Sequence, residues 1–201
     1  MIKKLKIIIL LLLSLSCKAQ SPILDISESG TGLPNGYYLK DTYNLLNPFE
    51  GIYEYTNGNT SFKMVLVKKV QQYNGEYYED LIIGEYQYIE NGIEKVNTLN
   101  EINTIYLDQG FHSISNNLIV NNNFKLFPCL NCLANEKRFY SPIFDPSTDT
   151  YADLIMLRTT ENGQEVMKIK ITNPSGGAYI EVEGPPAEFS LPLGELTLIK
   201  Q

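Results

Sequence analysis

The chain has 201 residues, a formal charge of −7, three cysteines, one histidine and no tryptophan. An acidic chain without a Lys/Arg patch cannot release counterions from phosphates, so we expect no nucleic-acid partner. The composition points to no cofactor and to no metal site. The length fits one domain around one hydrophobic core.

The first 19 residues are typical of a secretory signal peptide. Three lysines within residues 1–6 precede an apolar run from Ile7 to Leu13, which is too short to span a membrane. Small residues at Cys17 and Ala19 predict cleavage after Ala19. This cleavage removes four lysines and no acidic residue, which takes the formal charge from −7 to −11. We therefore expect an exported protein, in the periplasm, at the cell surface or secreted.

A second processing route stays open at Cys17. The stretch Ser14-Leu15-Ser16-Cys17 is similar to a loose lipobox, in which Cys17 is lipidated and becomes the first mature residue. A lipid on Cys17 would anchor the protein in the outer membrane. Membrane contact is expected only through such a lipid.

Cys129 and Cys132 are the two cysteines that remain after cleavage at Ala19. In the oxidising compartment that export implies, an even number of cysteines favours a disulfide. A C-x-x-C motif also occurs as a redox pair, but that chemistry requires the first cysteine at a helix N-terminus, whereas this motif lies in a β context. Zinc requires four ligands, and the chain has no second C-x-x-C. We predict a structural disulfide between Cys129 and Cys132.

The mature chain divides into a leader and a β domain. Residues 20–48 are rich in Ser, Gly and Pro, and we expect a flexible leader with one short helix near 41–47, capped by Asp41. Residues 49–201 are expected to form a single β domain.

Asn-Gly pairs punctuate that domain. A type I′ turn requires positive φ at both central residues, and Asn-Gly is its favoured pair. The pairs at Asn57, Asn74 and Asn91 recur every 17 residues, and we predict a hairpin tip at each. The five pairs are Asn35-Gly36, Asn57-Gly58, Asn74-Gly75, Asn91-Gly92 and Asn162-Gly163.

Alternation of apolar and polar residues predicts strands along most of the domain. Gly84 interrupts one of them, which often marks a bulge or a bend. No segment keeps a helical period. We expect an all-β fold of eight to ten strands, an antiparallel meander that closes into an up-and-down barrel, with a curved β-sandwich as the alternative. The expected strands cover residues 51–56, 60–70, 77–90, 93–99, 118–120, 138–144, 151–160, 167–171, 178–183 and 196–200, and residues 124–127 are a further candidate.

The segment Asn47-Pro48-Phe49-Glu50-Gly51-Ile52-Tyr53 resembles the start of a lipocalin-like (calycin) barrel, whose first strand opens with Gly-x-Trp. Gly51 matches that motif, and Tyr53 stands in place of the Trp. The resemblance implies a barrel whose mouth holds a small apolar ligand; the alternative is that Tyr53 fills the barrel floor. The whole chain is also similar to small uncharacterised secreted or lipid-anchored proteins of Gram-negative bacteria.

His112, the only histidine, is the residue on which a catalytic triad would depend. Its partners would have to be Ser113 or Ser115 and Asp108, and no nucleophile motif surrounds them. We expect a loop or half-buried histidine, no catalytic residue and no enzymatic activity. The first hypothesis is an envelope protein that binds a small apolar or amphipathic ligand, and the second is a structural or protein-interaction module. A thiol-redox enzyme or a hydrolase is the third.

Overall fold

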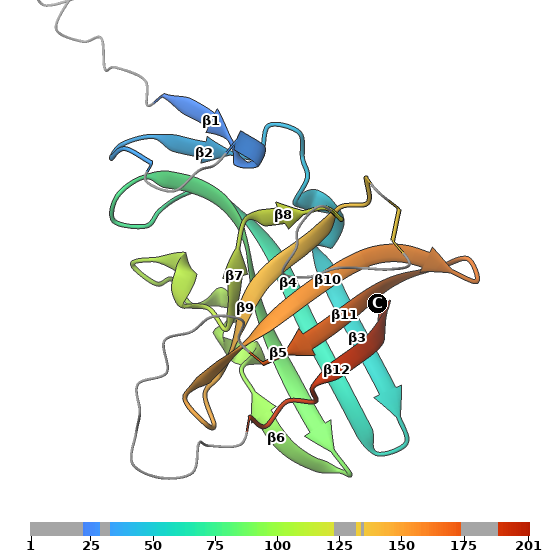
Figure 1. The fold of residues 1–201 in the computed structure, drawn as a ribbon. Coiled ribbons are helices and arrows are strands. Elements are labelled where there is room, and N and C mark those ends of the chain that lie inside the picture. The colour runs from blue at the N-terminus through green and yellow to red at the C-terminus, as the bar shows by residue number, and fades with distance from the viewer. Residues whose placement is uncertain (1–21, 29–32, 123–131, 134, 174–188) are drawn as a thin grey trace, which may run out of the picture.

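The described strands form one closed antiparallel β-barrel (Figure 1). The computed structural model describes residues 22–28, 33–122, 132–133, 135–173 and 189–201. Its helices are single 3-10 turns or slightly longer: η1 (Ile26–Glu28), η2 (Asn47–Phe49), η3 (Leu99–Asn103) and η4 (Gln109–Phe111). The strands are β1 (Ile23–Asp25), β2 (Tyr38–Lys40), β3 (Gly51–Asn57), β4 (Thr60–Tyr73), β5 (Tyr78–Glu90), β6 (Ile93–Asn97), β7 (Ile114–Asn116), β8 (Leu118–Val120), β9 (Arg138–Asp145), β10 (Thr150–Glu161), β11 (Gln164–Thr172) and β12 (Gly194–Lys200).

Eight of these strands make the barrel wall, in the order β5-β4-β3-β12-β11-β10-β9-β7, and β7 pairs with β5 to close the ring. Sequential neighbours are antiparallel, so the predicted meander and its closure into a barrel are confirmed. The expected strands at 124–127 and 178–183 lie outside the described residues. Short β2, β7 and β6 share one edge of the long strand β5, because each pairs with a different part of it.

The three predicted hairpins are present, but only one of them has the expected type I′ turn. At Asn91-Gly92 both residues have positive φ, 52° and 80°. In the first hairpin Asn57 pairs with Thr60, so the two-residue loop is Gly58-Asn59, one residue later than predicted. In the second, residues 74–77 form a four-residue loop, in which the Asn74 side chain accepts hydrogen bonds from two backbone N–H groups.

Gly92 tests whether the turn requires a residue that tolerates positive φ. The nearest atom to a Cβ built there is 4.0 Å away, so a substitution would introduce backbone strain without a steric clash. Gly92→Val should lower the free energy of unfolding by about 1–2 kcal/mol, because a β-branched residue resists positive φ. Urea denaturation measures the loss. Gly92→Asn is the matched control and should be much milder, since Asn tolerates this conformation. Equal losses for Val and Asn would contradict the explanation.

Gly84 serves close packing, and the bulge expected there is absent. The β4–β5 register runs through Gly84 without a shift, and the irregularity lies in β4 between Lys69 and Gln72. A Cβ on Gly84 would lie 2.5 Å from the Leu66 side chain and 3.1 Å from the Val65 carbonyl oxygen. Glycine therefore allows β4 and β5 to pack closely around the core.

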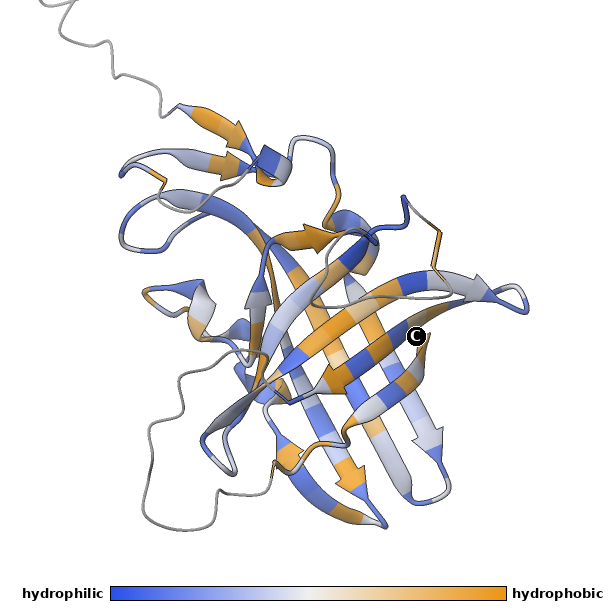
Figure 2. Cartoon of the chain, viewed as in Figure 1, coloured by the Kyte–Doolittle hydropathy of each residue, from blue (hydrophilic) through white to orange (hydrophobic). Residues whose placement is uncertain are grey.

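Hydrophobic and hydrophilic residues alternate along the strands (Figure 2), and the buried hydrophobic residues form one core cluster. Fully buried aromatic rings occupy much of the interior, and Phe62 stacks on Tyr86 with ring centroids 5.6 Å apart. The fully buried aromatic residues are Phe49, Tyr53, Phe62, Tyr86 and Phe139.

The expectation of a flexible leader over residues 20–48 is wrong for its described part. Strand β1 pairs in parallel with β2, and β2 pairs in parallel with β5. Ile26, Leu39 and Leu46 belong to the same core as the barrel. The leader segment is therefore part of the folded domain, because its apolar side chains are covered by the barrel.

The short helix expected near residues 41–47 is also absent. The chain turns at 42–43 and makes a 3-10 turn only at Asn47–Phe49. The Asp41 carboxylate accepts from Leu45 N and Leu46 N, and so stabilises a loop where we expected a helix N-cap. Among the described residues, no helix is both long and apolar enough to cross a membrane.

Candidate functional site

The outer face of β5 is unusual because it is buried. Side chains alternate along a strand, so Glu85 points away from the barrel interior that Ile82 and Tyr86 occupy. Leu81, Ile83 and Glu85 nevertheless have exposed fractions of 3%, 0% and 1%. The chain between β6 and β7, which includes η3 and η4, covers this face of the barrel wall (Figure 1).

Residues 104–113 of this covering segment have an inverted pattern of burial. Ile105, Leu107 and Phe111 are 90%, 100% and 71% exposed, whereas Gln109 and His112 are buried. Figure 2 shows the hydrophobic colour at the tip of this segment, where it extends from the barrel. We call the three exposed side chains the apolar projection. Exposed large apolar residues close together on one short segment make this segment a candidate binding surface.

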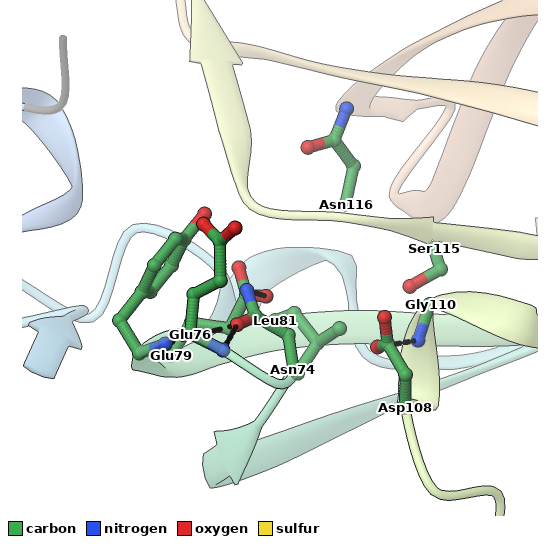
Figure 3. Close-up of a pocket in the computed structure, with 9 residues that line it drawn as sticks. Asn74, Glu76, Glu79, Leu81, Asp108, Gly110, Ser115 and Asn116 are labelled. Atoms are coloured by element: carbon green, nitrogen blue, oxygen red, sulfur yellow. Dashed lines mark hydrogen bonds between the residues drawn. The ribbon is translucent and has the colours of Figure 1, made fainter. Parts of the chain in front are cut away.

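A polar groove of about 320 Å³ lies beside the apolar projection, between β5, η4 and β7. Figure 3 shows Asp108 on one side of this groove and Glu76 and Glu79 on the other. No Lys or Arg is among its lining residues. Burial raises the pKa of Glu79, although Asn74 donates to one of its oxygens at 2.8 Å. We call this cavity the acidic groove.

His112 anchors the covering segment to the barrel wall. Its Nδ1 lies 2.7 Å from Glu85 Oε1, and both side chains are almost fully buried. The backbone N–H of Ser113 also donates to Glu85 Oε1, at 3.4 Å. His112 Nε2 and Glu85 Oε2 are buried and have no hydrogen-bond partner among the residues that the structure describes. His112 lies in the loop between η4 and β7, as one of the two expectations had it, but it is buried and not half-buried, because a carboxylate distant in sequence accompanies it into the interior.

The residues considered for a catalytic triad do not assemble into one. His112 pairs with Glu85, and Asp108 accepts a hydrogen bond from Gly110 N in its own turn. The Ser115 backbone N–H donates to Ser141 Oγ. Among the described residues, no group of three or more His, Cys, Asp or Glu side chains could hold a metal ion.

The barrel-start motif lies at one end of the filled interior. Gly51 adopts φ +148°, and Tyr53 is fully buried in the core. The Tyr53 hydroxyl lies 3.3 Å from the Glu50 carbonyl oxygen, and burial raises its pKa. Tyr53 therefore fills this region of the barrel.

A second cavity, of about 370 Å³, lies among the end of β5, Lys95 and residues 189–192.

Three of the sequence-based predictions concern residues that the structure does not describe. Signal cleavage after Ala19, lipidation of Cys17 and the Cys129–Cys132 disulfide all involve residues within 1–21 or 123–131, so they stay predictions. The sequence analysis missed Glu85 and the exposed Leu107. An acid between apolar residues in a strand was the one signal for Glu85, and an apolar residue inside an otherwise irregular stretch was the signal for Leu107.

Comparison with known proteins adds a family but no activity. A family model described as a family of unknown function (DUF6705) matches residues 1–201. No curated protein and no solved structure matches the chain. The lipocalin-like resemblance and the bacterial origin therefore remain hypotheses.

Proposed function

The chain belongs to the DUF6705 family of unknown function, and we propose that it is a non-enzymatic interaction protein of the cell envelope, which binds another protein through the apolar projection. The observation that carries this proposal is the exposure of Ile105, Leu107 and Phe111 on one short segment. Placement in the envelope rests on the basic and apolar N-terminus, whether it is cleaved after Ala19 or lipidated at Cys17.

The barrel interior supports an interaction role over storage of a ligand inside the barrel. Lipocalin-type binding requires an internal cavity, but aromatic and aliphatic side chains fill the described interior. Phe62 and Tyr86, on the neighbouring strands β4 and β5, stack on one another within the buried core. The acidic groove and the apolar projection both lie on the outer side of β5. Recognition on the outer surface is therefore the function that this arrangement serves best.

The charges of the acidic groove indicate the chemistry of the partner. Glu76, Glu79 and Asp108 line the groove, and no basic residue neutralises them from within its lining. The apolar projection continues from the same η4 turn. A protein segment that carries Lys or Arg next to large apolar side chains would satisfy both features, because its cations would meet carboxylates while its apolar groups cover Leu107 and Phe111. An anionic lipid surface would be repelled by the same carboxylates.

Site-specific photo-crosslinking in living cells tests the proposal. A benzoyl-phenylalanine placed at position 107 should crosslink to one protein, and sequencing of the adduct should show basic residues beside apolar ones. The same group at Tyr151, which is 57% exposed on β10, is the matched control and should give no such adduct. Phe111→Ser together with Ile105→Ser should reduce the yield from position 107 at least about fivefold, because burial of each large side chain contributes about 1.5–3 kcal/mol.

Two results would contradict the interaction role. The first is an adduct to lipid, or to a peptide without basic residues, which would assign the apolar projection to a membrane or to another kind of partner. The second is equal crosslinking from positions 107 and 151, which would mean that the contact is random collision.

A further inference from the structure

We infer that Glu85 and His112 form a proton-sensitive latch, which holds residues 104–113 closed on β5 and so controls how the apolar projection is presented. This inference rests on the proposed function for its biological meaning. The latch itself follows from the burial pattern and the hydrogen bonds of the covering segment.

Buried polar groups attach residues 104–113 to β5 by hydrogen bonds. The large apolar side chains of this segment are exposed, as described above, so little hydrophobic burial holds the tip in place. The hydrogen bonds of Gln109 and Gly110 stay within the segment, to Tyr106 O and to Asp108 Oδ1. Among the described hydrogen bonds of residues 104–113, those that reach β5 end on Glu85. Among the described residues, Glu85 is therefore the acceptor through which residues 104–113 are hydrogen-bonded to this strand.

The ionisable neighbours of the Glu85–His112 pair leave it without a compensating charge. Tyr106 contacts the His112 ring edge-on, with centroids 4.9 Å apart, and the Tyr106 hydroxyl is 3.4 Å from Glu101 Oε2. Burial and the nearby carboxylates raise the pKa of Tyr106, so its hydroxyl stays neutral.

The flanking strands do not change this balance. On β4, Val65 is opposite Glu85, and Lys63 is the nearest base in the register, two pairs further along, opposite Gln87. On β5 itself Tyr86 points to the other face, and its hydroxyl donates to the Phe144 carbonyl oxygen. None of these groups satisfies Glu85 Oε2 or His112 Nε2.

Because Glu85 and His112 are buried and no neighbouring charge compensates theirs, the closed state favours one protonation level of the pair. The pair has no net charge when it holds one titratable proton, either on the imidazole or on the carboxyl group, and net charge is costly in a buried site. When the segment opens, both groups are solvated. A solvated histidine loses its proton above about pH 6.5, and a solvated glutamate gains one below about pH 4.3. The latch should therefore be tightest near pH 5–6, and opening releases a proton at higher pH.

Hydrogen exchange of the full mature chain tests the latch. After correction for intrinsic exchange, the opening constant of residues 104–113 should rise about tenfold for each pH unit between pH 7 and pH 9, because one proton is released. The amides of the Asn162-Gly163 hairpin are the internal control and should keep a constant opening.

Two variants separate the latch from a purely structural contact. Glu85→Gln keeps the shape and an acceptor for His112 but cannot exchange its charge, so the pH dependence should disappear. The double variant Glu85→Gln with His112→Gln, which leaves the site without a titratable group, replaces it if Glu85→Gln alone does not fold. A flat profile in the unmodified protein, a retained profile in either variant, or exchange of residues 104–113 only together with β5 would overturn the latch. Crosslinking from position 107 that does not vary with pH would leave the proposed function intact and the latch wrong, whereas a latch profile without any crosslink would reject the function alone.

Discussion

Asp80→Ala should cost about 3–5 kcal/mol in the free energy of unfolding, because it removes the charged acceptor of a buried network. Asp80 lies on β5 with an exposed fraction of 2%. It accepts hydrogen bonds from the Tyr38 hydroxyl at 2.6 Å, Gln71 N at 2.9 Å and Asp41 N at 3.0 Å. Burial and the Asp80 carboxylate raise the pKa of Tyr38, so its hydroxyl remains a donor at every practical pH. Urea denaturation monitored by circular dichroism measures the loss.

Two further variants show whether the network or the side-chain volume is responsible. Asp80→Asn retains one acceptor oxygen and should lose less than the alanine variant. Tyr38→Phe removes the hydroxyl that donates to Asp80 Oδ1, and it should lower the free energy of unfolding by about 1 kcal/mol. If all three variants lost the same small amount of free energy of unfolding, the hydrogen bonds of Asp80 would not be what attaches β2 and the irregular part of β4 between Lys69 and Gln72 to the barrel.

Asp145→Ala should cost about 2–4 kcal/mol, since four donors lose a charged acceptor. Asp145 ends β9, is fully buried, and accepts from the backbone N–H and the hydroxyl of both Ser147 and Ser190, at 2.6–3.0 Å. Ser190 comes shortly before β12, and the adjacent Leu191 belongs to the core. The carboxylate therefore holds the approach to the last strand against the end of the barrel.

The same contacts make this contribution depend on pH. Burial by itself raises the pKa of Asp145, but the hydrogen bonds from Ser147 and Ser190 outweigh it and hold the pKa below its usual value. A lowered pKa in the folded state means that the stabilisation is complete above the ordinary aspartate pKa of about 4, and that it is lost as the pH falls through the lowered value. Asp145→Asn should therefore lose less stability than the unmodified protein between pH 5 and pH 2. Parallel losses would show that other carboxylates control the acid transition.

Local chemistry was sufficient to predict the barrel. Period-two alternation and turn residues are properties of neighbouring residues, so the hairpins from β3 to β6 and from β10 to β11 could be located from the sequence. The turn type was harder. Asn57 and Asn74 are followed by glycine just as Asn91 is, but the strand register shifted the first loop by one residue and lengthened the second. Register depends on which side chains face the core across two strands, and a dipeptide does not contain that information.

The all-β class, the meander and the closed barrel could be predicted from local sequence patterns, and the N-terminus predicts export. Three features depend on the folded arrangement: β2 pairs in parallel with β5, Glu85 accompanies His112 into a buried site, and Leu107 stays in solvent. The partners in these cases are about 27 to 40 residues apart along the chain. Such contacts depend on which segments of the whole chain bury their apolar side chains and pair their buried polar groups together. The candidate binding surface results from that arrangement.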